Sequence, residues 1–318
     1  FRYVFILIFN HYAHKYTMKS MKLYYPNSQI IYIVHFFLWS FLLHGNYCLF
    51  KKIVNKQGDV FNDKISKQVY NCFLNDLEIF SLSNKVVCLS QFSKQILLND
   101  YHINNIHLIR NGLENNELVL NKIRLREKYH IDKYEKVIIF VGRLHQDKGI
   151  VELIEAFKKL KYNDNVTRYR LLIVGDGDMK ICYNTTNDCL FSIIFTGYIS
   201  FEKLKEMYAI SDIGVLPSYH EQCSLAAIEM MSFGLPLITS DAIGFSEMVL
   251  DGYNGFKVAI GNDKNVYIDE LANNIKYLLS NQELMDSFGL ASYQIYTEKY
   301  SLSKMHDGYV KLFNTKGL

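Results

Sequence analysis

The sequence predicts an α/β protein built from two doubly wound domains. Two observations carry this prediction. From residue 137 onward, apolar runs of strand length alternate with amphipathic stretches of helix length, a rhythm typical of a parallel sheet covered on both faces. The first 110 residues repeat this rhythm less completely. With 318 residues, 49% of them hydrophobic and 21% charged, the chain has the size and composition of two ordinary globular domains.

In the C-terminal half, six apolar runs are expected to form strands, with helices between them. The predicted strands are 137–141, 171–174, 193–196, 213–216, 236–239 and 255–258. The predicted helices are 150–159, 201–209, 224–233 and 246–250. Helical spacing also marks 275–296, and an amphipathic stretch follows at 301–313.

In the N-terminal half, the predicted strands are 4–9, 30–35, 85–89 and 107–109, with helices over 68–80 and 93–100. The apolar run 30–43 is shorter than the roughly 20 residues that cross a bilayer, so we expect a buried strand that runs into a packed helix. Asn111-Gly112 is a turn signal, and a polar stretch follows it. We therefore predict domains at 1–125 and 126–295, and a final helix in 296–318 that packs back on the first domain.

Charge and cysteine usage narrow the class of protein. A formal net charge of +3 gives no reason to expect a nucleic-acid partner, although a Lys- and Tyr-rich surface leaves peripheral contact with acidic lipid open. The six cysteines form no C-x-x-C pair, so neither a zinc knuckle nor a disulfide framework is indicated. A cytoplasmic protein, with or without contact to the inner face of the membrane, fits best.

The loop that follows strand 137–141 carries two cations. It reads Gly142-Arg143-Leu144-His145-Gln146-Asp147-Lys148-Gly149, and a predicted helix begins directly after it. Arg143 and Lys148 at the carboxyl end of a strand can neutralise a diphosphate without a metal ion. Lysine and arginine on a surface loop are otherwise simply solvated, and the loop alone does not separate the two readings.

Two glutamates eight positions apart follow strand 213–216. Glu221 is expected in the loop and Glu229 in the next helix. The free amides at the start of that helix, those of Cys223, Ser224 and Leu225, attract anions, while ionised carboxylates accept hydrogen bonds from sugar hydroxyls. A nucleotide sugar offers both kinds of group. Glutamates on exposed helix faces are common, and only this setting distinguishes the pair.

These motifs together resemble those of the retaining glycosyltransferases with the GT-B fold, specifically glycosyltransferase family 4, the group 1 transferases. The resemblance covers roughly residues 86–256. Its motifs are the Ser90 to Gly112 pattern, the Gly142 to Gly149 loop, Gly175-Asp-Gly, Phe195-Thr-Gly-Tyr, the glutamate pair, and Glu247-Met-Val ahead of Asp251-Gly-Tyr-Asn-Gly255. In that fold, two Rossmann-like domains face a cleft, which is also where open α/β sheets bind ligands.

The resemblance implies a role for each matching residue. Gly142, Arg143 and Lys148 would hold the donor diphosphate, Glu221 the transferred sugar, Glu229 the ribose, and Gly197 the base. His35, at the end of a strand, would lie near the transferred sugar, with a histidine packed in the core at a strand end as the alternative. Catalysis would rest on His35, Glu221, Arg143 and Lys148. The resemblance also implies transfer with retention, with neither a metal nor a cofactor beyond the donor.

The chain departs from the family pattern at two places. Where the family has Glu-x-Phe-Gly, this chain has Glu221-Gln-Cys-Ser, so Ser224 must make the close approach that glycine allows. The family's N-terminal Gly-Gly loop and opening strands are absent, which leads us to expect an N-terminally truncated chain.

The donor could be a UDP- or GDP-sugar, and the acceptor could be a glycan, a lipid-linked hydroxyl or another hydroxyl. Two other functions stay open. One is a protein that binds nucleotide sugars without transferring them, and the other is a sugar-nucleotide epimerase of the same fold. The epimerase would need acid and base groups in the cleft, where only His35 and His145 are available.

Overall fold

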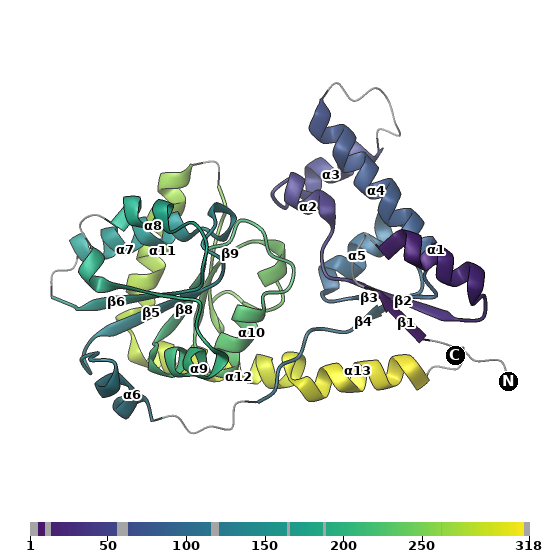
Figure 1. Ribbon diagram of the computed structural model, residues 1–318. Coiled ribbons are helices and arrows are strands. Elements are labelled where there is room, and N and C mark those ends of the chain that lie inside the picture. The colour runs from purple at the N-terminus through teal and green to yellow at the C-terminus, as the bar shows by residue number, and fades with distance from the viewer. Residues whose placement is uncertain are drawn as a thin grey trace. The chain divides into compact units, whose positions relative to one another are not determined.

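The computed structural model describes residues 6–9, 14–55, 63–115, 121–163, 166–186, 189–261 and 263–314. The chain divides into two compact units, unit 1 with residues 1–112 and 302–318, and unit 2 with residues 113–301. Each unit contains one parallel sheet with helices packed on it, as Figure 1 shows, so the predicted α/β class is confirmed. Residue 125, where the sequence analysis divided the chain, lies within a helix of unit 2. Residues 4 and 5 of the first predicted strand, and residues 116–120 of the predicted connection, lie outside the described residues.

Unit 1 has a four-stranded sheet with the order β1-β2-β3-β4, all parallel. Its strands are β1 (Ile6–Phe9), β2 (Gln29–Val34), β3 (Lys85–Cys88) and β4 (Ile106–Leu108). Its helices are α1 (Lys15–Tyr24), α2 (Leu38–Leu42), α3 (Tyr47–Asn55), α4 (Lys64–Leu82), α5 (Gln91–Asn99) and α13 (Leu302–Asn314). The predicted strand over 30–35 that runs into a packed helix is confirmed as β2 followed by α2.

The two faces of this sheet bury different partners, because side chains alternate along a strand. Ile30 and Val34 of β2 point into the larger core beneath α1–α5, whereas Ile31 packs with Leu312 of α13 on the other face. The ammonium group of Lys85 also donates to the carbonyl of Leu312 at 2.7 Å. The last helix of the chain thus completes the core of unit 1.

Unit 2 has a six-stranded parallel sheet with the order β10-β9-β8-β5-β6-β7. Its strands are β5 (Lys136–Val141), β6 (Tyr169–Val174), β7 (Ile193–Gly197), β8 (Ile213–Leu216), β9 (Leu237–Ser240) and β10 (Gly255–Val258). The chain builds outward from β5 through β6 to β7, then returns to the other side of β5 with β8. The strand order therefore reverses between β5 and β8.

The helices of unit 2 cover both faces of its sheet, with α7, α8 and α11 on one face and α9, α10 and α12 on the other (Figure 1). They are α6 (Lys122–Lys128), α7 (Ile150–Asn163), α8 (Met179–Thr186), α9 (Phe201–Ile210), α10 (Leu225–Ser232), α11 (Lys264–Leu279) and α12 (Gln282–Ile295). Short 3-10 turns are η2 (Gln146–Lys148), η3 (Leu190–Ser192) and η4 (Ile243–Phe245), and η5 (Tyr296–Tyr300) is a π-helical turn.

One predicted helix of unit 2 is wrong. Residues 246–248 form a turn, and residues 249 and 250 have no regular structure. The cause is Asn254, which is fully buried and whose side chain accepts from the amide of Leu250 at 2.7 Å and donates to the carbonyl of Met248 at 3.0 Å. A buried asparagine that binds nearby backbone groups competes with helical hydrogen bonds. The predicted helical stretch 275–296 is likewise two helices, because Asn281 caps the start of α12.

Candidate functional site

The predicted site residues of unit 2, except Gly197 at the end of β7, lie on the two segments that follow β5 and β8, where the strand order reverses. The loop 142–149 leaves the carboxyl end of β5, and the loop 217–224 leaves the carboxyl end of the neighbouring β8. Open α/β sheets bind ligands at this point, because the two loops diverge from adjacent strands and leave a crevice between them. The sequence placed both loops at strand ends but could not show that their strands are neighbours.

Backbone groups hold these two loops together. Gly149 has a φ of +67°, and a Cβ at this position would lie 2.1 Å from the carbonyl oxygen of Pro217. The amide of Tyr219 donates to the carbonyl of Asp147 at 2.8 Å. Only glycine allows so close an approach together with a left-handed backbone. The glycine after Lys148 therefore fixes the loop that carries Glu221.

The side chains of the two loops meet in an ion pair. The Nζ atom of Lys148 lies 2.5 Å from Oε2 of Glu221, and the two side chains are 23% and 13% exposed. Arg143, from the same loop as Lys148, is exposed, and its guanidinium group has no hydrogen-bond or ion-pair partner among the described residues. The structure thus brings together a cation with a carboxylate and leaves a second cation accessible on the same loop.

The backbone of Glu221 is fixed by a residue from a distant segment. The amide of Gly244 donates to the carbonyl of Glu221 at 2.9 Å, and a Cβ on Gly244 would lie 2.4 Å from the carbonyl carbon of Glu221. The sequence analysis did not assign Gly244 to the site. Its signal was present in the Glu247-Met-Val motif three residues later, but the contact itself depends on the fold.

Helix α10 begins beside Glu221, as predicted. Ser224 is its N-cap, with a φ of −75°, and its hydroxyl accepts from the amide of Ala227 at 3.3 Å. Serine is a favoured residue at this position because its side chain satisfies a free amide of the first turn. The backbone here needs no glycine, so the serine fits. Cys223 is half-buried and Leu225 is exposed on either side of it.

Glu229 lies one turn further along α10 and has a partner that the sequence analysis missed. The hydroxyl of Tyr208, on α9, donates to Oε2 of Glu229 at 2.5 Å. Burial raises the pKa of Glu229, and the hydrogen bond from Tyr208 opposes that rise. Oε1 of Glu229 has no hydrogen-bond partner within the described parts of the chain. No pattern in the sequence marks Tyr208 as a partner.

The ends of β6 and β7 lie beside the β5 loop. The amide of Gly142 donates to the carbonyl of Val174 at 3.0 Å, and the amide of Gly175 donates to the carbonyl of Gly197 at 3.1 Å. Gly197 has a φ of +65°, and a Cβ there would meet nothing within 4 Å. The predicted base-binding position therefore has open space above it.

His35 is the one predicted site residue that belongs to unit 1. It directly follows β2 and is half-buried. Burial lowers its pKa, which favours the neutral imidazole. A neutral imidazole can accept or donate a single hydrogen bond on either nitrogen, as a group beside a substrate hydroxyl must.

The part of the chain that holds this geometry matches a known family. Residues 121–295, more than half of the chain, match the model of the family described as Glycosyl transferases group 1. The chain belongs to the group 1 glycosyl transferases. The matched segment contains every predicted site residue except His35, and it ends at the last residue of α12.

This group 1 transferase is similar to glycosyltransferases from an archaeon and from a bacterium. It is 32% identical over 171 residues to an uncharacterized glycosyltransferase of Methanocaldococcus jannaschii, covering 51% of this chain and 43% of that one. It is 31% identical over 206 residues to UDP-Gal:alpha-D-GlcNAc-diphosphoundecaprenol alpha-1,3-galactosyltransferase of Escherichia coli, a match that covers 61% of this chain and 52% of that one. The chain thus spans about half the length of these curated relatives.

Solved structures confirm the fold of the group 1 transferase. Sucrose-phosphate synthase from Thermosynechococcus elongatus superposes with a TM-score of 0.76 at 19% identity, covering 97% of this chain and 72% of that one. At this identity, the similarity concerns the fold alone. The chain has the GT-B fold, with two Rossmann-like α/β units.

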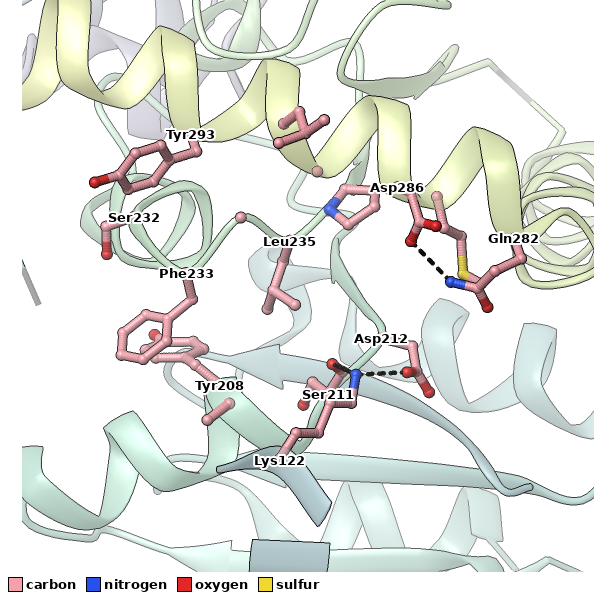
Figure 2. Close-up of a pocket in the computed structure, with 16 residues that line it drawn as sticks. Lys122, Tyr208, Ser211, Asp212, Ser232, Phe233, Leu235, Gln282, Asp286 and Tyr293 are labelled. Atoms are coloured by element: carbon pink, nitrogen blue, oxygen red, sulfur yellow. Dashed lines mark hydrogen bonds and ion pairs between the residues drawn. The ribbon is translucent and has the colours of Figure 1, made fainter. Parts of the chain in front are cut away.

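A large pocket of the transferase lies at the opposite edge of the unit 2 sheet (Figure 2). It has a volume of about 700 Å³ and includes residues that directly precede β8 and β9. Lys122 donates there to the carbonyl of Ser211 and to Asp212, both at 2.7 Å. Although burial alone would raise it, the pairs with Lys122 and Arg126 hold the pKa of Asp212 below its ordinary value. The pocket contains none of the predicted site residues.

Among the described residues, no group of three or more histidine, cysteine, aspartate or glutamate side chains could share a metal ion. In the same parts of the chain, every helix is too short or too polar to pass through a bilayer.

Proposed function

We propose that the protein moves a sugar from a nucleotide-diphosphate sugar to an acceptor hydroxyl, with retention of configuration and without a bound metal, as a member of glycosyltransferase family 4. Arg143 and Lys148 would bind the diphosphate, with help from the amides of residues 223–225. Glu221 would bind hydroxyls of the transferred sugar and Glu229 those of the ribose. Gly197 would face the base.

The observation that carries this proposal is the Lys148–Glu221 pair at the strand reversal. An ammonium group has three donors, so Lys148 can bind a phosphate oxygen while it still donates to Glu221. Oε1 of Glu221 has no partner among the described residues and is left for a sugar hydroxyl. The pair therefore places a phosphate-binding cation beside a sugar-binding carboxylate, and one nucleotide sugar offers a phosphate and a sugar hydroxyl to the two groups.

In the proposed reaction, the bond between the anomeric carbon and the diphosphate oxygen breaks, and the acceptor oxygen forms its bond on the same face of the sugar. The acceptor proton passes to the departing phosphate oxygen. Arg143 and Lys148 would stabilise the negative charge that develops on the diphosphate, which is the kind of electrostatic contribution that dominates many enzymes. His35 would lie near the sugar and accept a hydrogen bond from one of its hydroxyls.

The Escherichia coli relative supports a donor class and an acceptor class for this chain. That protein is a galactosyltransferase that uses UDP-galactose and acts on a sugar linked to diphosphoundecaprenol. For this chain, we accordingly propose a UDP- or GDP-sugar as donor and the hydroxyl of a glycan, lipid-linked or otherwise, as acceptor.

The test is calorimetric titration of the chain, without added metal, with UDP, GDP, UDP-glucose, UDP-galactose, UDP-N-acetylglucosamine and GDP-mannose. We expect one nucleotide to bind at micromolar concentration. Lys148→Ala should weaken the binding of the nucleoside diphosphate and of its sugar conjugate alike, by tenfold or more, because a charge-assisted hydrogen bond to phosphate contributes roughly 1.5–3 kcal/mol. Glu221→Ala should weaken the sugar conjugate more than the bare diphosphate.

Lys158 and Glu155 provide the matched control. They form an ion pair at 3.2 Å on the surface of α7, within the same unit. Lys158→Ala and Glu155→Ala should leave nucleotide binding unchanged. Full binding in both Lys148→Ala and Glu221→Ala would refute the site, and binding with no transfer to any acceptor would point to a protein that only binds nucleotide sugars.

A further inference from the structure

The first turn of α11 touches the loop that carries Glu221 and the helix that directly follows the Lys148 loop. This helix follows β10, so it begins near the carboxyl edge of the sheet, and it packs along α7. Lys264 and Tyr267 are three positions apart, which places them on the same face of the helix. Lys264 makes a polar contact with helix α7, and Tyr267 makes one with the loop that carries Glu221.

The first contact reaches the element that follows Lys148. Nζ of Lys264 lies 2.6 Å from Oε1 of Glu152, whose side chain is only 5% exposed. Glu152 is in the first turn of α7, four positions after Lys148. A nearly buried carboxylate needs a partner. The ion pair of Glu152 with Lys264 joins the start of α7 to the start of α11.

The second contact reaches the loop that carries Glu221. The hydroxyl of Tyr267 donates to the carbonyl of Pro217 at 3.0 Å, and the tyrosine is 2% exposed. Its ring also contacts that of Tyr219, with centroids 6.0 Å apart. Phenylalanine would fill the same space, so the hydroxyl serves the hydrogen bond rather than the packing.

The loop 217–224 has no regular structure of its own and depends on such contacts. The hydroxyl of Ser240 donates to the carbonyl of Ser218, and the amide of Gly244 donates to that of Glu221. Ser240, Gly244 and Tyr267, each from a different element outside the loop, thus bind three of its carbonyl groups. A carboxylate on a loop tethered in this way is held in one place before any ligand arrives.

We propose that Tyr267 is a positioning residue for Glu221, and that the first turn of α11 holds the Lys148 loop and the Glu221 loop in the relative position that a nucleotide sugar requires. This inference rests on the proposed function, because it concerns the same site. It assigns a role in sugar recognition to a helix that contributes no side chain to the ligand itself.

The test compares Tyr267→Phe with Tyr277→Phe, a tyrosine of the same helix that is 59% exposed. The probes are the nucleoside diphosphate and the nucleotide sugar that the wild-type chain binds best. We expect Tyr267→Phe to weaken the binding of the nucleotide sugar about five- to tenfold, the change that one lost hydrogen bond produces. The dissociation constant of the bare diphosphate should stay within about twofold of the wild-type value. Tyr277→Phe should change neither constant.

The ratio of the two dissociation constants separates positioning from a merely structural role. If Tyr267→Phe lowers the melting temperature but keeps the wild-type ratio, the inference is overturned. If it does not fold, Ser240→Ala removes a neighbouring tether of the same loop and must show the same change in ratio. Failure of the wild-type chain to bind any of the six nucleotides refutes the proposed function instead.

Discussion

The two units of the molecule stabilise their structures in different ways. In unit 2, the loops at the strand ends contact one another through backbone groups, as at Gly149 and Pro217. In unit 1, the largest core includes a cluster of aromatic rings, in which Trp39 stacks on Phe50 with centroids 4.0 Å apart. Both units have an apolar core, but the site loops of unit 2 also depend on particular glycines.

This difference explains why the family is visible in one unit and faint in the other. Where two backbone segments approach so closely that a Cβ would not fit, only glycine is accepted, and such a position leaves a motif in the sequence. An aromatic core accepts many combinations of similar volume and leaves only an apolar pattern. The predicted donor residues therefore lie in unit 2, and His35 is the only candidate that unit 1 provided.

The largest expected effect would come from breaking the backbone contact in unit 2. Gly149→Ala combines a left-handed backbone with a methyl group 2.1 Å from the Pro217 carbonyl oxygen, so the two loops must separate. We expect a loss of roughly 3–5 kcal/mol in the free energy of unfolding, the range of severe single substitutions, and loss of nucleotide binding. Urea unfolding and calorimetric titration would measure the two effects.

Gly252→Ala is the matched control for that substitution. Gly252 has a similar φ of +72°, but a Cβ there meets nothing within 4 Å. Only the backbone strain remains, which costs about 1–2 kcal/mol, and nucleotide binding should persist. Equal losses in the two variants would show that the contact between the loops is not what requires glycine at position 149.

The sequence predicted the elements better than the contacts between them. The strands of unit 2 followed from apolar runs, and the loop positions of Arg143, Lys148 and Glu221 followed from the strands. The pairing of β5 with β8 brings Lys148 to Glu221, and nothing in a single sequence specifies which strands are neighbours. The partners Tyr208 and Tyr267 were invisible for the same reason.

The error at 246–250 has a related origin. Its apolar spacing is compatible with a helix, and the competing interaction comes from Asn254, which lies beyond the segment and is buried only in the folded unit. Local propensity cannot account for a side chain that tertiary packing has brought to the backbone.

A second prediction tests the aromatic core of unit 1. Asp76 is buried in it and accepts a hydrogen bond from Tyr101 at 2.9 Å. Burial raises the pKa of Asp76 to about 7, although that hydrogen bond lowers it in part. The carboxyl is then protonated in the folded unit and ionised in the unfolded chain between about pH 4 and 7. The contribution of Asp76 to the free energy of unfolding is therefore fully present below the pKa of the unfolded chain. It decreases as pH rises and is lost once pH has passed through 7, a change of up to about 4 kcal/mol.

The measurement uses Trp39, the one tryptophan of the chain, which lies in the same cluster. Its fluorescence reports the unfolding of unit 1 by urea, at a series of pH values from 4 to 8. In Asp76→Asn, the decline of stability with rising pH should be absent or much smaller. An equal decline in the variant would assign the pH dependence to another group.

The smallest expected effect concerns the hydrogen bond between Tyr208 and Glu229, which joins a buried aromatic ring to the donor site. Tyr208→Phe keeps the ring against Phe233, 5.3 Å away, and removes only the hydroxyl. Loss of one such bond should weaken nucleoside diphosphate binding about fivefold, or roughly 1 kcal/mol. Because the hydroxyl lowers the pKa of Glu229 against the effect of burial, the variant should carry a higher pKa at this carboxyl.

The sign of the pH dependence then decides whether Glu229 binds ribose as an ionised acceptor. Affinity should be full above the pKa of Glu229 and fall as pH decreases through it, and in Tyr208→Phe the fall should begin at a higher pH. Titration with the nucleoside diphosphate and with its 2′-deoxy analogue, at several pH values, measures this directly. If the two ligands bind equally well, or if both proteins share one pH profile, Glu229 does not contact the ribose. The link between the interior of unit 2 and its donor site would then be structural only.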